Sequence, residues 1–200
     1  MQLKGQNLAC SRGGHEVFSG LNFSIADGEA LLVTGRNGSG KSSLLRLIAG
    51  LVRTAAGQLT LEGGDGEASI GEQSHYLGHQ DAVKHSLTVH ENLEFWMRYL
   101  GSGAGAIEPA LETVGLDPLA GLPAAYLSAG QRRRLSIARL VAVKRPIWLL
   151  DEPTSALDAS SQQRLAELMR NHLAAGGMIV AAAHGPIGLE PARELNLGPV

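Results

Sequence analysis

The sequence predicts an α/β fold built on a mostly parallel sheet. Short, wholly apolar segments that suit strands buried on both faces alternate with longer segments that carry apolar residues at helical spacing. This alternation is typical of α/β domains. Glycine is also common, with 26 residues in 200, against a usual share of about 7%. We therefore expect some of these glycines to let the backbone bend closely around a bound ligand.

The predicted strands and helices follow one another in a regular order. Val17–Ile25 alternates apolar and polar residues and ends at a turn, Asp27-Gly28, whereas the later strands are wholly apolar. The expected strands are Val17–Ile25, Ala30–Val33, Ile147–Leu150 and Met178–Ala183. The expected helices of this part are Lys41–Ala49, closed by Gly50, and Ser160–Ala175.

Residues 88–144 differ from the rest, because they carry helical periodicity and no convincing strand. A Gly/Ala-rich linker, Gly101–Ala106, interrupts them. We therefore expect a single domain in which an α/β core (1–81 and 144–200) contains an N-terminal antiparallel β part, and a helical lobe (82–143) is inserted in the core.

Composition excludes several classes of protein. A hydrophobic share of 44% supports a core and excludes a disordered tail. The net charge is −2, from 17 basic and 19 acidic residues, so we expect no nucleic-acid partner. The single cysteine, Cys10, forbids an internal disulfide and a cysteine-built zinc site, which fits a reducing compartment.

No apolar run is long enough to span a membrane. The longest, Met178–Ala183, has six residues, where a spanning helix needs about 20. The first residues, Met1–Asn7, lack the apolar stretch of an export signal. We expect the chain to stay in the cytoplasm and to depend on another protein for any work at a membrane.

A glycine-rich loop follows the predicted strand Ala30–Val33 and matches G-x-x-x-x-G-K-[ST] in full. In such loops the backbone N–H groups and the helix N-terminus bind phosphate, the lysine reaches the β- and γ-phosphates, and the last hydroxyl can bind Mg²⁺. The sequence therefore predicts a nucleoside triphosphate site of the P-loop type. Its residues are Gly35, Arg36, Asn37, Gly38, Ser39, Gly40, Lys41, Ser42 and Ser43.

The strand Ile147–Leu150 delivers two carboxylates at its end, Asp151 and Glu152. Asp151 can hold the shell of a magnesium ion together with Ser42, and Glu152 can polarise an attacking water. A solvated acidic pair at a strand end is the alternative interpretation. Beside a full phosphate loop, phosphoryl transfer to water is the favoured chemistry.

Further segments resemble the motifs of ABC ATPases across essentially the whole chain. Leu127-Ser128-Ala129-Gly130-Gln131 resembles the signature LSGGQ, with alanine for the first glycine. Gln80 stands at the Q-loop position, Ser155–Asp158 resembles the D-loop, and His184 follows a strand as the switch histidine does. The order and spacing of the motifs make the resemblance specific.

The resemblance implies roles for these residues. Ser128, Ala129, Gly130 and Gln131 would bind the γ-phosphate of a partner subunit's ATP, which implies a head-to-tail dimer of two copies. Gln80 would sense the Mg²⁺ ion and the attacking water and signal to a membrane partner, and His184 would contact the γ-phosphate and orient the water. The D-loop residue is Asp158.

A narrower resemblance is to the ATP-binding subunits of cytochrome c maturation, the haem exporter family. It implies a peripheral subunit on the cytoplasmic face of the inner membrane, paired with an integral permease of the CcmB type, that serves haem export or ATP-driven release of haem from its chaperone. The segments that carry it are Asn7–Gly14, Phe18–Phe23, Tyr76–Lys84, Glu91–Trp96, Leu127–Arg134 and Ala183–Pro186.

Other functions remain open from the residues alone. Another exporter, such as a lipoprotein-release system, would use the same ATPase. An ABC ATPase acting on DNA or ribosomes is disfavoured by the short interval from Gln80 to Ser128, which has no heptads or cysteines. A non-hydrolysing regulatory cassette is disfavoured by Lys41, Asp151, Glu152 and His184.

Some residues depart from the ABC pattern or remain ambiguous. Arg12 stands near the position where many relatives stack an aromatic on adenine, which leaves the base preference open.

Arg132–Arg134 point in different directions on a helix, so we expect a solvated helix rather than a nucleic-acid patch. The aromatic residues Phe95, Trp96 and Tyr99 form either core or a dock for a membrane subunit.

Overall fold

The structure is a computed structural model that describes residues 1–101, 107–183, 185 and 187–198. Its contacts divide the chain into two compact units. The first comprises residues 1–78, 145–153 and 168–200, and the second comprises residues 79–144 and 154–167. The division into a core and a lobe at 82–143 stays a prediction, and most of the linker 101–106 lies outside the described residues.

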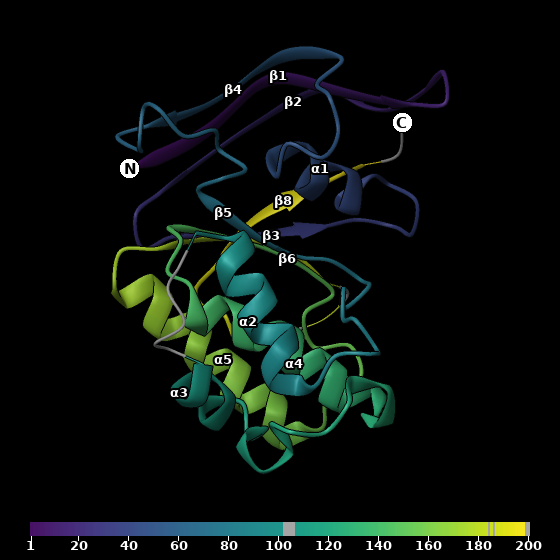
Figure 1. Ribbon diagram of the computed structural model, residues 1–200. Coiled ribbons are helices and arrows are strands. Elements are labelled where there is room, and N and C mark those ends of the chain that lie inside the picture. Colours follow the sequence, from purple (N-terminus) through teal and green to yellow (C-terminus); the bar gives the residue numbers. More distant parts are fainter. Residues whose placement is uncertain (102–106, 184, 186, 199–200) are drawn as a thin grey trace. The chain divides into compact units, whose positions relative to one another are not determined.

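A five-stranded parallel sheet forms the centre of the first unit, and it confirms the predicted α/β fold (Figure 1). The strand order is β5-β6-β7-β3-β8. β6 and β7 are buried at every position, as wholly apolar runs predict. The strands are β3 (Ala30–Thr34), β5 (Ser74–Leu77), β6 (Ile147–Asp151), β7 (Met178–Ala182) and β8 (Arg193–Asn196).

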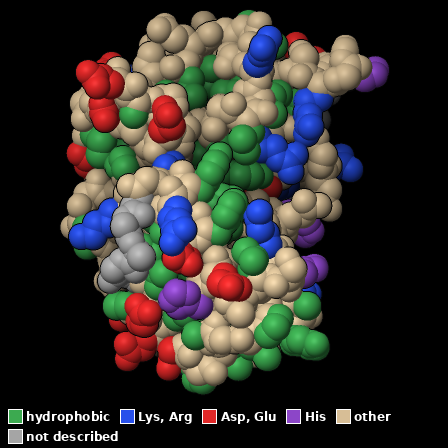
Figure 2. Space-filling model, in the orientation of Figure 1, with side chains coloured by type: hydrophobic (Ala, Val, Ile, Leu, Met, Phe, Trp, Pro, Cys, Tyr) green, Lys and Arg blue, Asp and Glu red, His purple; other side chains and the backbone are tan. Residues whose placement is uncertain are grey.

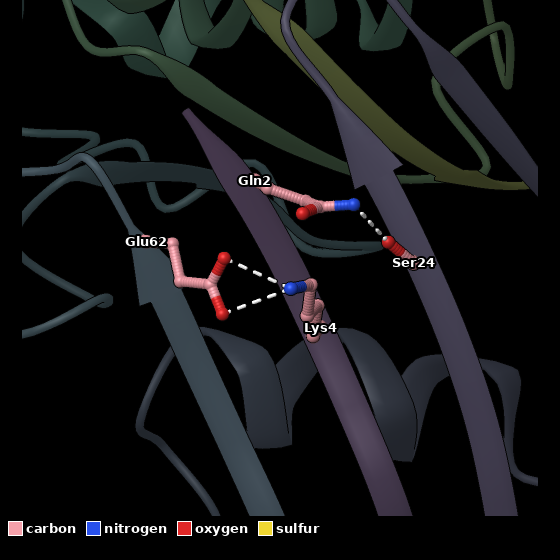
Figure 3. Close-up of polar contacts among 4 residues, drawn as sticks. All are labelled: Gln2, Lys4, Ser24 and Glu62. Carbon is pink, nitrogen blue, oxygen red and sulfur yellow. Dashed lines mark hydrogen bonds and ion pairs between the residues drawn. The ribbon is translucent and has the colours of Figure 1, made fainter.

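A second, antiparallel sheet has the order β2-β1-β4, from β1 (Gln2–Arg12), β2 (His15–Ala26) and β4 (Ala56–Glu62). Polar side chains tie the central strand β1 to both neighbours (Figure 3). Lys4 Nζ lies 2.8 Å from each carboxylate oxygen of Glu62 in β4, and Gln2 Nε2 donates to Ser24 Oγ in β2 at 2.9 Å. Register on the opposite face is set by burial, with Leu3 and Ile25 fully buried partners.

Helix α1 (Lys41–Ile48) joins the two sheets of the first unit, because it contacts β1 as well as β6 and β7. Its apolar residues recur at helical spacing, and Leu44, Leu45, Leu47 and Ile48 are all buried. The helix closes at Gly50, which has the positive φ of 73° that favours glycine. One apolar cluster results, built from α1 and strands of both sheets.

The second unit is helical, with α2 (Val89–Tyr99), α3 (Ile107–Thr113) and α4 (Ala129–Ala142), and the short 3₁₀ helices η2 (Asp117–Leu119) and η3 (Ala124–Tyr126). α2 and α3 both pack on α4. α2 and α4 each begin with a reciprocal capping box, Thr88 with Glu91 and Ser128 with Gln131. α5 (Ala159–Ala174) contributes its part up to Glu167 to this unit and the remainder to the first.

Among the described residues, no helix combines the length and apolar character that crossing a bilayer requires. On the face drawn in Figure 2, basic and acidic side chains both reach the surface, with apolar side chains between them. This distribution agrees with the nearly balanced charge of the sequence.

Candidate nucleotide-binding site

The loop Gly35–Gly40 connects the end of β3 to the start of α1, as predicted. Its glycines have positive φ angles, 140° at Gly35, 85° at Gly38 and 98° at Gly40. A Cβ atom on Gly35 would lie 2.5 Å from the carbonyl oxygen of Leu197 and 2.6 Å from Ser39 Oγ. Only glycine therefore fits this turn, which brings the backbone into a compact cradle.

The N-terminus of α1 is free to receive an anion. Its N-cap, Gly40, makes no side-chain capping bond, and the first turn holds no acidic residue. Lys41 is only 8% exposed, and its ammonium group donates to the carbonyl oxygens of Gly35 at 2.8 Å and Arg36 at 3.2 Å. An ammonium has three N–H donors, so one remains for a phosphate. Ser39 Oγ is buried and has no hydrogen-bond partner among the described residues.

Asp151 lies at the carboxyl end of β6 and faces α1. Its side chain accepts a hydrogen bond at Oδ1 from Ser42 Oγ, at 3.0 Å. Asp151 is 3% exposed. A hydroxyl and a carboxylate held this close to an uncapped helix N-terminus are the hard oxygen donors that Mg²⁺ prefers. The residues present therefore fit a magnesium ion that accompanies a nucleotide.

Glu152, directly after Asp151, has a left-handed backbone with φ of 47°, and its N–H donates to the carbonyl oxygen of Ala182 at the end of β7. A non-glycine residue held there is strained, and such strain gathers at functional sites. Ala82, two residues after Gln80, and Ala156 in the D-loop also have positive φ, 52° and 62°.

The signature and D-loop residues lie in the second unit and contact each other there. Ser128 caps α4, since its Oγ accepts from the N–H of Gln131 while Gln131 Oε1 accepts from the N–H of Ser128. A Cβ on Gly130 would lie 2.9 Å from the carbonyl oxygen of Ala156. This glycine thus allows the D-loop backbone to approach the signature closely.

Asp158 caps the start of α5. Its Oδ1 accepts from the N–H of Ser161 at 2.8 Å and from Ser160 Oγ at 3.0 Å. The backbone hydrogen bond from Ser161 is the largest cause that lowers the pKa of the Asp158 carboxyl group. The D-loop residue therefore stays ionised and fixes the end of its own loop.

Gln80 is exposed, and the next residue, Asp81, is tied to the signature helix. Arg133 Nη1 lies 3.3 Å from Asp81 Oδ1, and Ser136 Oγ donates to the carbonyl oxygen of Asp81. The expectation of a solvated arginine helix is wrong, since Arg133 is 2% exposed and Arg139 is 7% exposed. Burial lowers the pKa of the Arg139 guanidinium to about 10, and Arg139 packs over the ring of Trp96 at 4.4 Å.

Two further residues, Arg12 and His184, were also predicted to lie at the nucleotide site. Arg12 is exposed at the end of β1, opposite His15 across the turn, which leaves its side chain accessible to a base. His184 lies outside the described residues. The structure thus brings the phosphate loop, Ser43 included, together with Asp151 and Glu152 in the first unit, and places Gln80, the signature and Asp158 in the second.

A phosphate cradle at a helix N-terminus, with a hydroxyl and a carboxylate beside it, defines a P-loop nucleoside triphosphatase. A family model described as ABC transporter matches residues 18–155. The chain is 61% identical over 198 residues to the "Cytochrome c biogenesis ATP-binding export protein CcmA" of Nitrobacter winogradskyi, covering 99% of this chain and 98% of the relative. It is 58% identical over 200 residues to the protein of the same name from Bradyrhizobium diazoefficiens, covering 100% of both.

The fold is similar to that of a solved structure, a putative ABC transporter ATP-binding protein from Pyrococcus furiosus. The TM-score is 0.83, at 23% identity and with 98% of both chains covered. The chain belongs to the ABC transporter family as one of its ATP-hydrolysing subunits, and within that family to the cytochrome c biogenesis ATP-binding export proteins, CcmA.

Proposed function

We propose that the chain hydrolyses ATP in the presence of Mg²⁺, within a head-to-tail pair of copies, and drives an integral permease of the CcmB type. The pair would lie peripherally on the cytoplasmic face of the inner membrane and serve c-type cytochrome biogenesis. The observation that carries the chemistry is the hydrogen bond between Ser42 and Asp151 beside the phosphate loop. The assignment to c-type cytochrome biogenesis is supported by the names of the relatives, which are cytochrome c biogenesis ATP-binding export proteins.

The residues divide the chemistry of hydrolysis among them. The loop N–H groups and Lys41 bind the β- and γ-phosphates. Ser42, Asp151 and Gln80 would hold the magnesium ion, which when bound neutralises charge on the phosphates. Glu152, which has a left-handed backbone directly after β6, would accept a proton from the attacking water. His184 would contact the γ-phosphate.

The proposed dimer follows from how the motifs are distributed. The first unit carries the phosphate loop and the second carries the signature. The N-terminus of α4 has no acidic residue in its first turn and presents the N–H groups of Ala129 and Gly130, which suit the γ-phosphate of a partner's ATP. A second copy in head-to-tail orientation would complete each site.

The surface of α2 supports docking of a membrane partner near the Q-loop. Trp96 Nε1 donates to the carbonyl oxygen of Ala82, two residues after Gln80, at 3.2 Å. Phe95 is 37% exposed and Tyr99 is 72% exposed, and their rings stack with centroids 6.3 Å apart. Exposed aromatic rings are enriched at protein interfaces, so the structure favours a dock over core packing for these two residues.

The cargo would be haem, either exported or released from its chaperone by ATP-driven motion. A replacement experiment tests the process. The chain's own gene is exchanged for Glu152→Gln, with Glu167→Gln on the exposed face of α5 as the matched control, and covalent haem in c-type cytochromes is measured. Loss of covalent haem in Glu152→Gln alone is expected. Normal levels of all c-type cytochromes in Glu152→Gln would contradict the proposed process.

A further inference from the structure

Two side chains outside the phosphate loop converge on the carboxylate of Asp151. Tyr76, in β5, places its hydroxyl oxygen 3.5 Å from Asp151 Oδ2. Arg46, in α1, donates from Nε to the same hydroxyl oxygen at 3.2 Å. Because Ser42 holds the other carboxylate oxygen, Oδ1, both oxygens of Asp151 face an oriented hydroxyl group.

Only one assignment of donors and acceptors fits the contacts among Arg46, Tyr76 and Asp151. A guanidinium has donors and no acceptor, so the Tyr76 oxygen accepts from Arg46 and its own hydrogen is left to point at Asp151. A tyrosine phenol ordinarily has a pKa of about 10, so at neutral pH its hydroxyl hydrogen is present and available to Asp151.

The strand geometry holds the phenol at this place. β5 and β6 are adjacent and parallel, with Tyr76 opposite Leu149, two residues before Asp151. Gly78 leaves room for the ring, since a Cβ there would lie 3.0 Å from Tyr76 Cε1 and 3.1 Å from its hydroxyl oxygen. The contact of 3.5 Å to Asp151 is long for an O–H···O bond, so it is weak and leaves Oδ2 available to a metal ion.

We propose that Tyr76, supported by Arg46, is a positioning residue that fixes the rotation of the Asp151 carboxylate for magnesium binding. Rotation of a carboxylate about its terminal bond is broad unless both oxygens are held, and ligating carboxylates are themselves commonly hydrogen-bonded. The inference rests on the proposed role of Asp151 toward Mg²⁺.

The test uses Tyr76→Phe in the full chain, which removes the hydroxyl and keeps the ring. Binding of a fluorescent ATP analogue is titrated with Mg²⁺ and compared with binding in EDTA. We expect the half-saturating Mg²⁺ concentration to rise about three- to tenfold, as loss of one hydrogen bond predicts, and binding in EDTA to be unchanged. Tyr126→Phe, at an exposed tyrosine, is the matched control.

A second variant separates positioning from folding. Arg46→Met leaves the phenol in place and frees its hydrogen to turn away from Asp151, so the half-saturating Mg²⁺ concentration should again rise. Because Arg46 acts through Tyr76, the double variant should match Tyr76→Phe alone.

The outcomes distinguish this inference from the magnesium site itself. A parent chain that responds to Mg²⁺, with Tyr76→Phe within about twofold of it, would overturn the positioning role alone. An equal loss of nucleotide binding in EDTA would assign Tyr76 a merely structural role. Nucleotide binding by the parent that ignores Mg²⁺ would contradict the proposed magnesium site and this inference with it.

Discussion

Ser42 Oγ donates a hydrogen bond to Asp151 Oδ1 at 3.0 Å, across 109 positions of the sequence. The contact joins the start of α1 to the end of β6. It depends on the parallel sheet, in which β3 and β6 are separated by β7 and end at the same edge. The phosphate loop after β3 and the carboxylate after β6 therefore meet at this edge, as ligand sites of open α/β sheets do.

Ser42→Ala should raise the Mg²⁺ concentration that half-saturates ATP hydrolysis by about tenfold or more, since the variant removes one hard oxygen ligand. Steady-state phosphate release over a range of Mg²⁺ concentrations measures it. Ser24→Ala is the matched control, because it removes a hydroxyl that pairs with Gln2 in the antiparallel sheet (Figure 3). Equal Mg²⁺ dependence of the Ser42→Ala and parent chains would contradict the ligand assignment.

Glu152→Gln should bind ATP like the parent and lose turnover by about a hundredfold or more, because the amide cannot accept the proton of the attacking water. The ATP-bound pair should also persist longer. Steady-state phosphate release and size-exclusion chromatography with MgATP measure the two effects. Unchanged steady-state hydrolysis would show that another group polarises the water.

Arg12→Tyr should increase the preference for ATP over GTP. A guanidinium stacks on any base, whereas a tyrosine ring supplies the aromatic group that the resemblance to ABC ATPases leads us to expect near this position. Competition between the two nucleotides for the full-length chain measures the ratio. A strong preference of the parent for ATP, equal to that of Arg12→Tyr, would exclude Arg12 as the cause of relaxed selectivity.

Asp81→Asn should lower the melting temperature by several degrees, equivalent to about 1–2 kcal/mol, because Arg133 is buried and loses a charged partner. Because Asp81 is partly exposed, the expected loss of stability is smaller than that for breaking a fully buried ion pair. Glu94→Gln breaks the exposed i,i+4 pair with Arg98 and should change stability by less than about 0.5 kcal/mol. Equal melting temperatures for the two variants would contradict a structural role of the Asp81–Arg133 pair.

The parent should lose stability as the pH falls below 6.5, partly through His172. Burial lowers the pKa of His172, whose ring stacks on Trp148 at 4.0 Å. The unfolded chain therefore binds more protons between the folded pKa and 6.5, and stability decreases through that window as the pH falls. His172→Phe keeps the stacked ring and should show a smaller fall in melting temperature between about pH 7.5 and 5.5. His85→Phe, at an exposed position, should retain the fall shown by the parent.

Much of the fold was predictable because its signals are local. The buried strands β3, β6 and β7 are short apolar runs, and the phosphate loop has fixed residue types at fixed spacing. β8 gave no such signal. It is a sheet-edge strand with the sequence RELN and little burial, and polar residues are common at sheet edges.

The contacts around the site were less predictable because they join distant residues. A run of arginines indicates a solvated helix, and nothing near Arg133 in the sequence identifies Asp81, 52 positions away, as its partner. Tyr76 looks like an ordinary strand aromatic until β5 is placed beside β6. The positive φ of Glu152 likewise has no sequence signal, since it comes from the turn after β6 and the bond to Ala182.

The proposed role of the chain depends on its association with a membrane permease. The most direct measurement is a detergent pull-down of tagged Glu152→Gln protein with MgATP, followed by mass spectrometry of the recovered proteins. We expect recovery of an integral permease of the CcmB type together with an untagged second copy of the chain, and loss of both when Lys41→Ala is combined with Glu152→Gln. Recovery of a different permease, of ribosomes or of DNA would contradict it.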